Sequence, residues 1–215
     1  MSRRVQLTAK RLLDILVAAA GLVLLLPLFA LVAVCIRVGS RGPVFFSQER
    51  AGCGGKPFRI SKFRTMVEHA DRIGSGLYVS QNDSRITSVG KILRRLSIDE
   101  LPQLLHIVTG KMSLVGPRPA LPYQLKLYTT EQARRLLMRP GLTGWSQVNG
   151  RNLLSWPERI EKDIWYVDNF SLWLDARILL RTLKVWISGN GIYAPRDRFF
   201  FSAHDDIPTP SRKDS

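Results

Sequence analysis

Cysteine and acidic residues are scarce in this chain of 215 residues. The two cysteines, Cys35 and Cys53, provide neither a disulfide framework nor a cysteine-rich zinc site, so a reducing compartment is expected. Asp and Glu number 17 against 32 Lys and Arg, which gives a formal net charge of +15. Because 45% of the residues are hydrophobic, we expect a packed core and exclude a wholly disordered protein. The sequence contains no internal repeat.

The excess of positive charge has three ordinary explanations: nucleic acid, an anionic membrane surface or a phosphorylated substrate. Arginine supplies 23 of the 32 basic residues. Its planar guanidinium binds a phosphate through two parallel hydrogen bonds, a geometry that lysine does not offer. The composition therefore favours phosphate as a partner, although individual arginines are often surface charges or contacts to lipid head groups.

An uncharged run of 22 residues extends from Ile15 to Ile36. A spanning helix needs ~20 apolar residues, and the apolar part of a signal peptide is only ~7–15 residues long, so we expect this segment to enter a membrane and remain there. Pro27 divides the run into arms of about 18 and 14 Å, and neither arm crosses a ~30 Å hydrocarbon core. Basic residues flank both ends of the run. We therefore favour a re-entrant helical hairpin broken at Pro27, with a straight spanning helix as the alternative.

A β-hairpin is expected after this segment. Pro43–Arg50 and Pro57–Met66 are rich in Phe, Ile and Val and are joined by a glycine-rich stretch at 51–55. The glycine spacing matches neither a Walker loop nor a dinucleotide fingerprint, so we prefer a turn to a phosphate-binding loop. Side chains at i and i+2 project from one side of a strand, so Lys62 and Arg64 could bind one phosphate together.

Two adjacent carboxylates, Asp99 and Glu100, lie where a helix is expected to begin. We place Asp99 at or beside the N-cap, because a cap at Ser97 would put Pro102 at the fifth helical position, where its ring meets a carbonyl. Capping alone would explain both carboxylates, since the helix macrodipole stabilises acidic side chains there by ~0.3–1 kcal/mol each. A chemical role is the second interpretation, because paired carboxylates can divide the tasks of nucleophile and metal ligand.

The surroundings of the acidic pair favour this second interpretation. A carboxylate that attacks phosphorus needs cations nearby to neutralise the charge on the phosphoryl oxygens. Arginines lie in the expected helix before the pair and in two stiff loops after it, at Arg94, Arg95, Arg118 and Arg151. Rigid loops suit phosphate contacts, although either loop arginine taken singly is more often a surface charge.

The carboxy-terminal third holds all five tryptophans, which suggests an interface. Ser155 and Glu158 match a capping box that opens a helix to about Val167. A further helix, from Leu172 to about Ile187, mixes basic and large apolar side chains, and it fits either the membrane surface or the protein core. We expect a partly ordered tail beyond Gly189, whose Phe199, Phe200 and Phe201 could contact lipid.

The motifs in combination resemble the bacterial sugar transferases, the monotopic phosphoglycosyl transferases. The matching segments are Lys10-Arg11 with Asp14, Lys62–Met66, Arg94 and Ser97–Leu104, Met112–Pro119, Arg139–Trp145 and Asn149–Asn152. The resemblance implies an α+β, mostly helical fold with a re-entrant membrane helix-hairpin at residues 1–38. A small cytoplasmic catalytic domain with a short β-hairpin and interfacial amphipathic helices would follow at 39–190, and the tail at 191–215. One departure is Leu26, since members often place a small polar residue before the anchor proline.

The resemblance also implies an activity. A sugar-1-phosphate passes from a UDP-sugar to a membrane polyprenyl (undecaprenyl) phosphate, UMP is released, and Mg²⁺ is required. This is the first membrane step of bacterial glycan assembly (capsule, O-antigen, exopolysaccharide or glycoprotein glycan), on the cytoplasmic face of the inner membrane. Asp99 would be the nucleophile that forms a covalent phosphosugar intermediate in a ping-pong mechanism, and Glu100 its partner, with Mg²⁺ at both.

We predict that eight further residues contact the substrates. They are Lys10, Lys62, Arg64, Arg94, Arg95, Arg118, Arg151 and Asp163. The transferase needs no nucleic acid, and the broad apolar face of the last helix leaves a homodimer open. Two other functions remain possible at this stage: a non-catalytic, membrane-anchored basic scaffold for anionic lipid or nucleic acid, and a membrane phosphatase that depends on Asp99.

Overall fold

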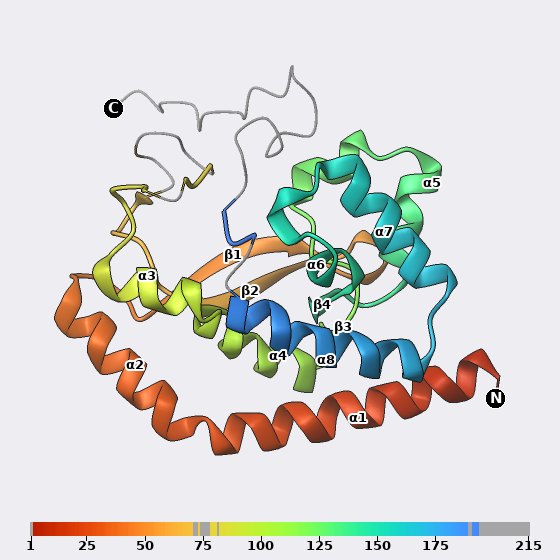
Figure 1. The fold of residues 1–215 in the computed structure, drawn as a ribbon, viewed down its shortest axis with the longest axis horizontal. Helices are drawn as coiled ribbons and strands as arrows, with labels where there is room; N and C mark the ends of the chain where they lie inside the picture. The colour runs from red at the N-terminus through yellow and green to blue at the C-terminus, as the bar shows by residue number, and fades with distance from the viewer. Residues whose placement is uncertain (1, 71–72, 74–77, 81, 189–190, 194–215) are drawn as a thin grey trace.

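The computed structural model describes residues 2–70, 73, 78–80, 82–188 and 191–193. Helices α1 (Arg3–Leu24) and α2 (Leu26–Gly39) form a long bent arm along one side of the molecule (Figure 1). No described helix is by itself long and apolar enough to cross a membrane, whereas this pair together has the length and composition. The Phe199–Phe201 prediction lies outside the described residues.

The two helices of the arm are bent by 59° at Leu25. The bend lies two residues before Pro27, which occupies the first turn of α2. A proline ring is tolerated there because the first-turn N–H groups have no partner within the helix. The predicted interruption of the apolar run is therefore confirmed. Large apolar side chains cover the outer surface of the arm and are more than half exposed: Leu12, Leu13, Leu16, Val17, Val23, Leu24, Leu26, Leu31, Val34 and Val38.

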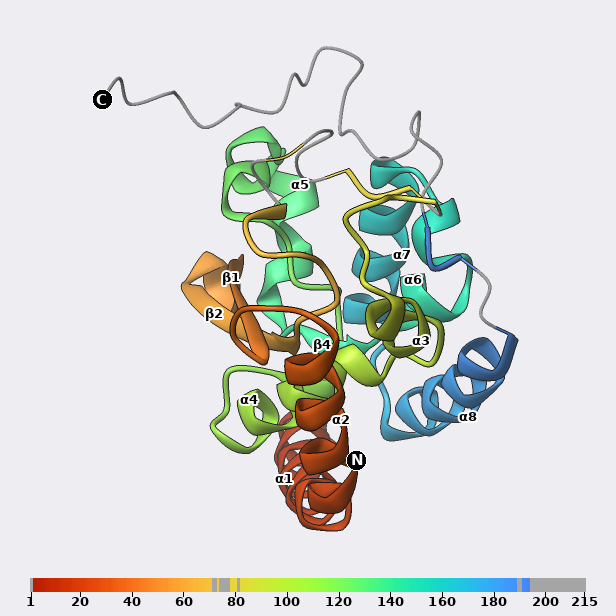
Figure 2. The ribbon, with the colours of Figure 1, turned by 90° about the vertical axis from the view of Figure 1, so that its left-hand side faces the viewer.

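The predicted hairpin is confirmed. Strands β1 (Phe45–Ala51) and β2 (Pro57–Phe63) pair antiparallel, and the short 3-10 helix η1 (Cys53–Gly55) connects them. The hairpin and the last helix, α8 (Leu172–Ser188), lie on opposite sides of the arm (Figure 2).

A second, parallel sheet of two short strands was not expected from the sequence. Strand β3 (Ser113–Val115) pairs with β4 (Gly141–Thr143); the second segment was predicted as part of a loop, and the first was not predicted as a strand. Each strand has three residues, which is too short for an alternating pattern to be recognised. The pairing brings two distant loops together directly beside the functional site.

Helices make up most of the remaining chain, as predicted. They are α3 (Ser88–Arg95), η3 (Ile98–Gln103), α4 (Leu104–Val108), η4 (Pro122–Leu127), α5 (Thr130–Ala133), η5 (Arg134–Leu137), α6 (Trp145–Val148), η6 (Arg151–Leu153) and α7 (Trp156–Asp168). The capping box at the start of α7 is present, and the Ser155 N–H donates to the Glu158 carboxylate at 2.7 Å.

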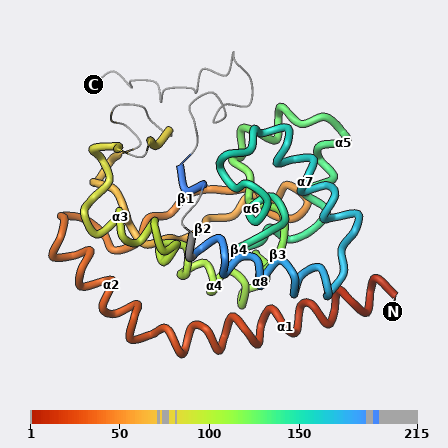
Figure 3. The backbone as a smooth tube through the Cα atoms, in the orientation of Figure 1, coloured from red at the N-terminus to blue at the C-terminus, as the bar shows by residue number. Residues whose placement is uncertain are grey.

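Buried polar contacts join α1 to the rest of the protein. Lys10 Nζ lies 2.6 Å from the Asp175 carboxylate of α8 and donates to the Val115 carbonyl of β3 at 2.9 Å. One turn later, the Asp14 carboxylate accepts from Ser113 Oγ at 2.7 Å. The tube drawing shows α1 running below α4, β3 and α8 (Figure 3). Lys10 therefore joins α1 to β3 and α8. We had predicted that Lys10 contacts the substrates, but it lies apart from the cavity that contains the acidic pair.

Candidate active site

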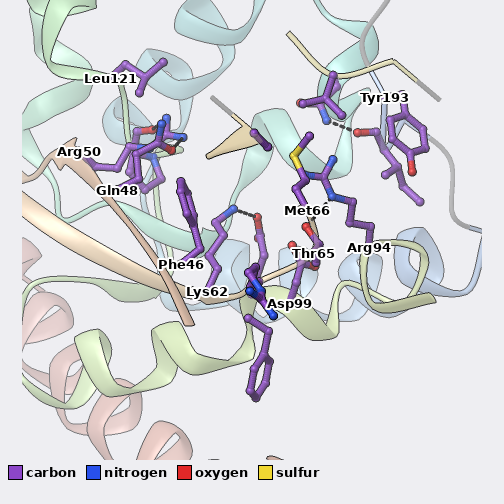
Figure 4. Close-up of a pocket in the computed structure, with 18 of the residues that line it drawn as sticks. Phe46, Gln48, Arg50, Lys62, Thr65, Met66, Arg94, Asp99, Leu121 and Tyr193 are labelled. Atoms are coloured by element: carbon purple, nitrogen blue, oxygen red, sulfur yellow. Dashed lines mark hydrogen bonds and ion pairs between the residues drawn. The ribbon is translucent and has the colours of Figure 1, made fainter. Parts of the chain in front are cut away.

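A cavity of about 380 Å³ lies between the β-hairpin, the segment after β2, the start of η3 and the loops that follow β3 and α6 (Figure 4). Asp99 and Glu100 both line it. Basic side chains dominate the lining: Arg50, Lys62, Arg64, Arg94, Arg118, Arg151 and Arg159. Its acidic residues are Glu68, Asp99 and Glu100. This excess of positive charge is suited to a ligand that carries several negative charges.

The local fold leaves Asp99 free of a capping role. Ser97, and not Asp99, is the N-cap residue of η3, and its side chain makes no capping hydrogen bond. The preference for Asp99 as the cap was therefore wrong. Pro102 does stand at the fifth position, inside a 3-10 helix, and the α-helix α4 begins only after it, at Leu104. Within the part of the chain that the structure describes, no hydrogen bond reaches the Asp99 carboxylate.

Among the described residues, Glu100, unlike Asp99, forms ion pairs with neighbouring basic side chains. Lys62 Nζ lies 2.6 Å from Glu100 Oε1, and the Arg118 guanidinium lies 3.7 Å from the same oxygen. Burial alone would raise the pKa of Glu100, but the charges of Lys62 and Arg118 outweigh burial and hold that pKa well below its ordinary value. Glu100 is therefore a fixed anion.

Asp99 titrates in the opposite direction. Burial raises the pKa of Asp99 to about 6; the positive charge of Lys62 opposes the rise, and the negative charge of Glu100 adds to it. Two adjacent carboxylates with pKa values moved apart are typical of sites in which one group reacts and the other supports it.

Four of the predicted basic residues surround the acidic pair. Lys62 and Arg118 approach Glu100, as described above. Arg151 donates to Ser97 Oγ at 2.9 Å, directly beside the pair, and Arg94 Nε donates to Thr65 Oγ1 at 2.8 Å. Both Ser97 and Arg151 have left-handed backbones, with φ of 54° and 56°. Such conformations cost a non-glycine residue ~1–3 kcal/mol each and often mark functional sites.

Arg64 lines the same cavity as Lys62, but its guanidinium also contacts the segment after α2. Its guanidinium donates to the Ser40 carbonyl at 2.9 Å and to the Arg41 carbonyl, just beyond the end of α2. The Arg64 N–H still donates to the Val44 carbonyl at 2.9 Å, one residue beyond the end of β2. Arg95 is exposed on α3 and lies outside the cavity lining, unlike its neighbour Arg94.

Asp163 lies in the protein core and not in the cavity. It is fully buried, forms an ion pair with Arg135 and accepts from Ser146 Oγ at 2.8 Å. Arg135 also donates to the Arg118 carbonyl at 2.9 Å. The Asp163–Arg135 pair therefore supports the loop that carries Arg118 from behind, and the predicted substrate contact at Asp163 is replaced by this supporting contact.

Two cavity arginines, Arg50 and Arg159, were missed by the sequence analysis. Burial, together with the charge of Arg118, lowers the pKa of each to about 10. Arg50 lies on the same side of β1 as Phe46 and Gln48, so strand alternation could have identified it. No sequence signal identifies Arg159, because it reaches the cavity only through the placement of α7.

Close backbone packing fixes the loop that carries Arg118. A Cβ atom on Gly116 would lie 2.3 Å from the Arg139 carbonyl oxygen, and one on Gly144 would lie 2.1 Å from that of Gly116. A side chain at either glycine would force the loops after β3 and β4 apart. The two glycine-containing motifs are therefore two halves of one structural unit.

The two carboxylates suit a shared magnesium ion. Among the described residues no group of three or more His, Cys, Asp or Glu side chains forms a complete metal cage. Mg²⁺ commonly takes one or two carboxylates and completes its shell with water and substrate phosphates. Asp99 and Glu100 supply two such carboxylates.

Comparison with known proteins identifies the family. The sequence profile described as bacterial sugar transferase matches residues 5–189. The chain is 50% identical over 165 residues to the uncharacterized sugar transferase EpsL of Bacillus subtilis, covering 77% of this chain and 79% of that protein. It is 42% identical over 199 residues to the exopolysaccharide production protein ExoY of Rhizobium meliloti, covering 86% and 88%. It is 44% identical over 193 residues to the UDP-glucose:undecaprenyl-phosphate glucose-1-phosphate transferase of Caulobacter vibrioides, covering 86% and 72%. The chain therefore belongs to the bacterial sugar transferase family.

Proposed function

We propose that this enzyme transfers a sugar-1-phosphate from a UDP-sugar to a polyprenyl phosphate and releases UMP. The Caulobacter relative is named for such a transfer from UDP-glucose to undecaprenyl phosphate, and the Rhizobium relative for exopolysaccharide production. The observation that carries the proposal is the free Asp99 carboxylate beside a fixed Glu100, in a cavity lined by seven basic side chains. This arrangement suits a diphosphate donor and an anionic acceptor.

The first step is attack of an Asp99 carboxylate oxygen on the phosphorus that bears the sugar. A bond forms between that oxygen and phosphorus, the bond from phosphorus to the bridging oxygen breaks, and UMP leaves with the bridging oxygen. In the second step, an oxygen of the polyprenyl phosphate attacks the same phosphorus and the Asp99 carboxylate is released. The product is a polyprenyl diphosphate sugar, and the enzyme returns to its initial state.

The contacts divide the tasks between the two carboxylates. Glu100 is engaged by Lys62 and Arg118, which lowers its reactivity as a nucleophile. Asp99 accepts no hydrogen bond within the described residues, and its pKa of about 6 leaves most of it ionised at neutral pH. Lys62, Arg94, Arg118 and Arg151 are placed to bind phosphoryl oxygens. Mg²⁺ held by Asp99, Glu100 and the diphosphate would neutralise phosphate charge.

The bent arm of α1 and α2 would hold the cavity at the membrane surface. We propose that α1 and α2 enter the cytoplasmic leaflet as a re-entrant hairpin, which buries the exposed apolar side chains of the arm in lipid. A membrane-embedded acceptor then presents its phosphate at head-group depth. Because the donor nucleotide leaves before the acceptor enters, one cavity serves both substrates.

Asp99→Asn tests the proposal. The purified variant and the wild-type enzyme are incubated with a panel of UDP-sugars, Mg²⁺ and polyprenyl phosphate, and UMP is measured. Asp168→Asn is a matched control, because Asp168 pairs with Arg134 on the exterior of the protein. We expect wild-type turnover in the control and loss of UMP release in Asp99→Asn; turnover retained in Asp99→Asn contradicts the nucleophile role. A phosphatase would instead release free phosphate, and a basic scaffold would release neither product.

A further inference from the structure

The cavity has an apolar wall in addition to its basic lining. Phe45, Phe46 and Val67 line it and remain 52%, 45% and 39% exposed. We propose that this wall binds the first isoprene units of the acceptor while Lys62 receives the acceptor phosphate. The inference rests on the proposed function, and it assigns the acceptor to one end of the cavity.

The register of the hairpin places the Phe46 ring beside the Lys62 ammonium group. Phe46 is paired directly with Lys62 across the hairpin, so the two side chains project from the same face. Lys62 Nζ in turn contacts Glu100 at 2.6 Å. Figure 4 shows Phe46 and Lys62 side by side above Asp99. An apolar surface next to an ammonium group is complementary to a phosphate attached to a hydrocarbon chain.

A row of aromatic rings joins this wall to the arm. Phe45 stacks on Phe63 with ring centroids 5.3 Å apart, and Phe63 meets Phe29 of α2 edge-on at 5.4 Å. Phe63 is only 1% exposed, so it links the exposed Phe45 ring to α2 through the core and fixes the position of this wall relative to the arm. The exposed Phe45 and Phe46 rings therefore stand between α2 and Lys62, where they can shield the first isoprene units of an acceptor from water.

The other end of the cavity is better suited to the nucleotide. Arg50 lies four residues along β1 from Phe46, a distance of about 13 Å. Arg159 and Tyr123 line the same cavity, and Arg50 Nε is buried without a hydrogen-bond partner among the described residues. A nucleotide needs hydrogen-bond donors of this kind, whereas the Phe45, Phe46 and Val67 wall offers only apolar groups. Charge and polarity thus separate the two substrates.

Kinetics of Phe46→Ser and Phe46→Leu test the assignment. Serine removes the apolar surface, and leucine retains most of it without an aromatic face. We expect Phe46→Ser to raise the KM for polyprenyl phosphate about tenfold, and Phe46→Leu to raise it less than about threefold. The KM for the UDP-sugar and the burst of UMP formed with donor alone should stay at wild-type values in both variants. Phe46 is 45% exposed and belongs to none of the core clusters formed by the described residues, so folding should be preserved.

Leu137→Ser is the matched control, because Leu137 is 67% exposed and lies outside this cavity. It should leave both KM values unchanged. An unchanged acceptor KM in Phe46→Ser overturns the inference while the donor burst leaves the proposed function intact. A raised donor KM in both Phe46 variants would show that the ring stacks on the nucleobase, which also overturns it. Absence of a UMP burst in the wild-type enzyme overturns the proposed function and this assignment together.

Discussion

The Asp99 side chain is held in an environment that favours its protonated form. A pKa raised from 3.8 to about 6 means that the folded protein binds a proton more tightly than the unfolded chain does. Stability contributed by protonated Asp99 is therefore present at acidic pH and is lost as pH rises from about 4 through 6. Above that range the charged carboxylate lowers the free energy of unfolding, as expected of a residue retained for chemistry.

Asp99→Asn should accordingly stabilise the protein at neutral pH while abolishing activity. The pKa difference corresponds to at most ~3 kcal/mol, and partial exposure of the carboxylate reduces the expected gain to about 1–2 kcal/mol. Thermal unfolding in detergent with a chelator present, at pH 4 and at pH 7.5, measures this. A higher Tm for the variant at pH 7.5 and a smaller difference at pH 4 are expected. Equal destabilisation at both pH values would indicate a structural role instead.

The buried Asp163–Arg135 pair is expected to behave differently from the cavity residues. Removing one partner leaves a charge in the core without compensation, so Asp163→Asn should cost ~3–5 kcal/mol of stability. The double variant Asp163→Leu with Arg135→Met removes both charges and should recover part of this loss. Chemical denaturation of Asp163→Leu, of Arg135→Met and of the double variant measures the coupling. Additive losses would contradict a direct ion pair.

The sequence predicted which kinds of side chain form the site better than it predicted which individual residues reach the cavity. Asp99, Glu100, Lys62, Arg94, Arg118 and Arg151 were predicted as site residues, and the fold brings all six into one cavity. Lys10 and Asp163 were also predicted to contact the substrates, but both residues are buried in ion pairs away from this cavity. No local pattern distinguishes a buried ion pair from a ligand contact, since the difference depends on which distant residue packs opposite.

Helix α3 positions Arg94 by packing its Gly90 backbone closely against the Thr65 backbone. A Cβ atom at Gly90 would lie 2.0 Å from the Thr65 carbonyl oxygen, and the Thr65 side chain is the partner of Arg94. Gly90→Ala therefore should push α3 away from the segment after β2. We expect a loss of about 2 kcal/mol or more and reduced turnover, compared with little change in Lys91→Ala on the exposed side of the same helix. Wild-type Tm and activity in Gly90→Ala would contradict this packing.

The elements that could be predicted are those with a strong local pattern. The hairpin, the α7 capping box and the interruption near Pro27 followed from turn chemistry and periodicity. The parallel pairing of β3 with β4 could not be predicted, because it depends on backbone contact between glycines about 25 residues apart. The position of Asp99 in η3 was also missed, because the local sequence pattern does not distinguish a 3-10 helix from the first turn of an α-helix.

For the molecule as a whole, the bent arm predicts a specific topology. In a variant lacking Cys35 and Cys53, single cysteines at Ser2 and Arg41 would lie at the two ends of the arm. A re-entrant hairpin places both on the cytoplasmic side, so a membrane-impermeant thiol reagent should label them only after the cells are permeabilised. Labelling of one end in intact cells would establish a spanning helix.

The most direct measurement of the central claim is the mass of the enzyme trapped with donor alone. After incubation with a UDP-sugar and Mg²⁺ without acceptor, the protein should gain one sugar-phosphate, and peptide mapping should locate it on Asp99. Addition of polyprenyl phosphate should remove the added mass and yield lipid-linked product. An enzyme that turns over with both substrates, yet carries no added mass with donor alone, would contradict a covalent intermediate and require direct transfer between the two substrates.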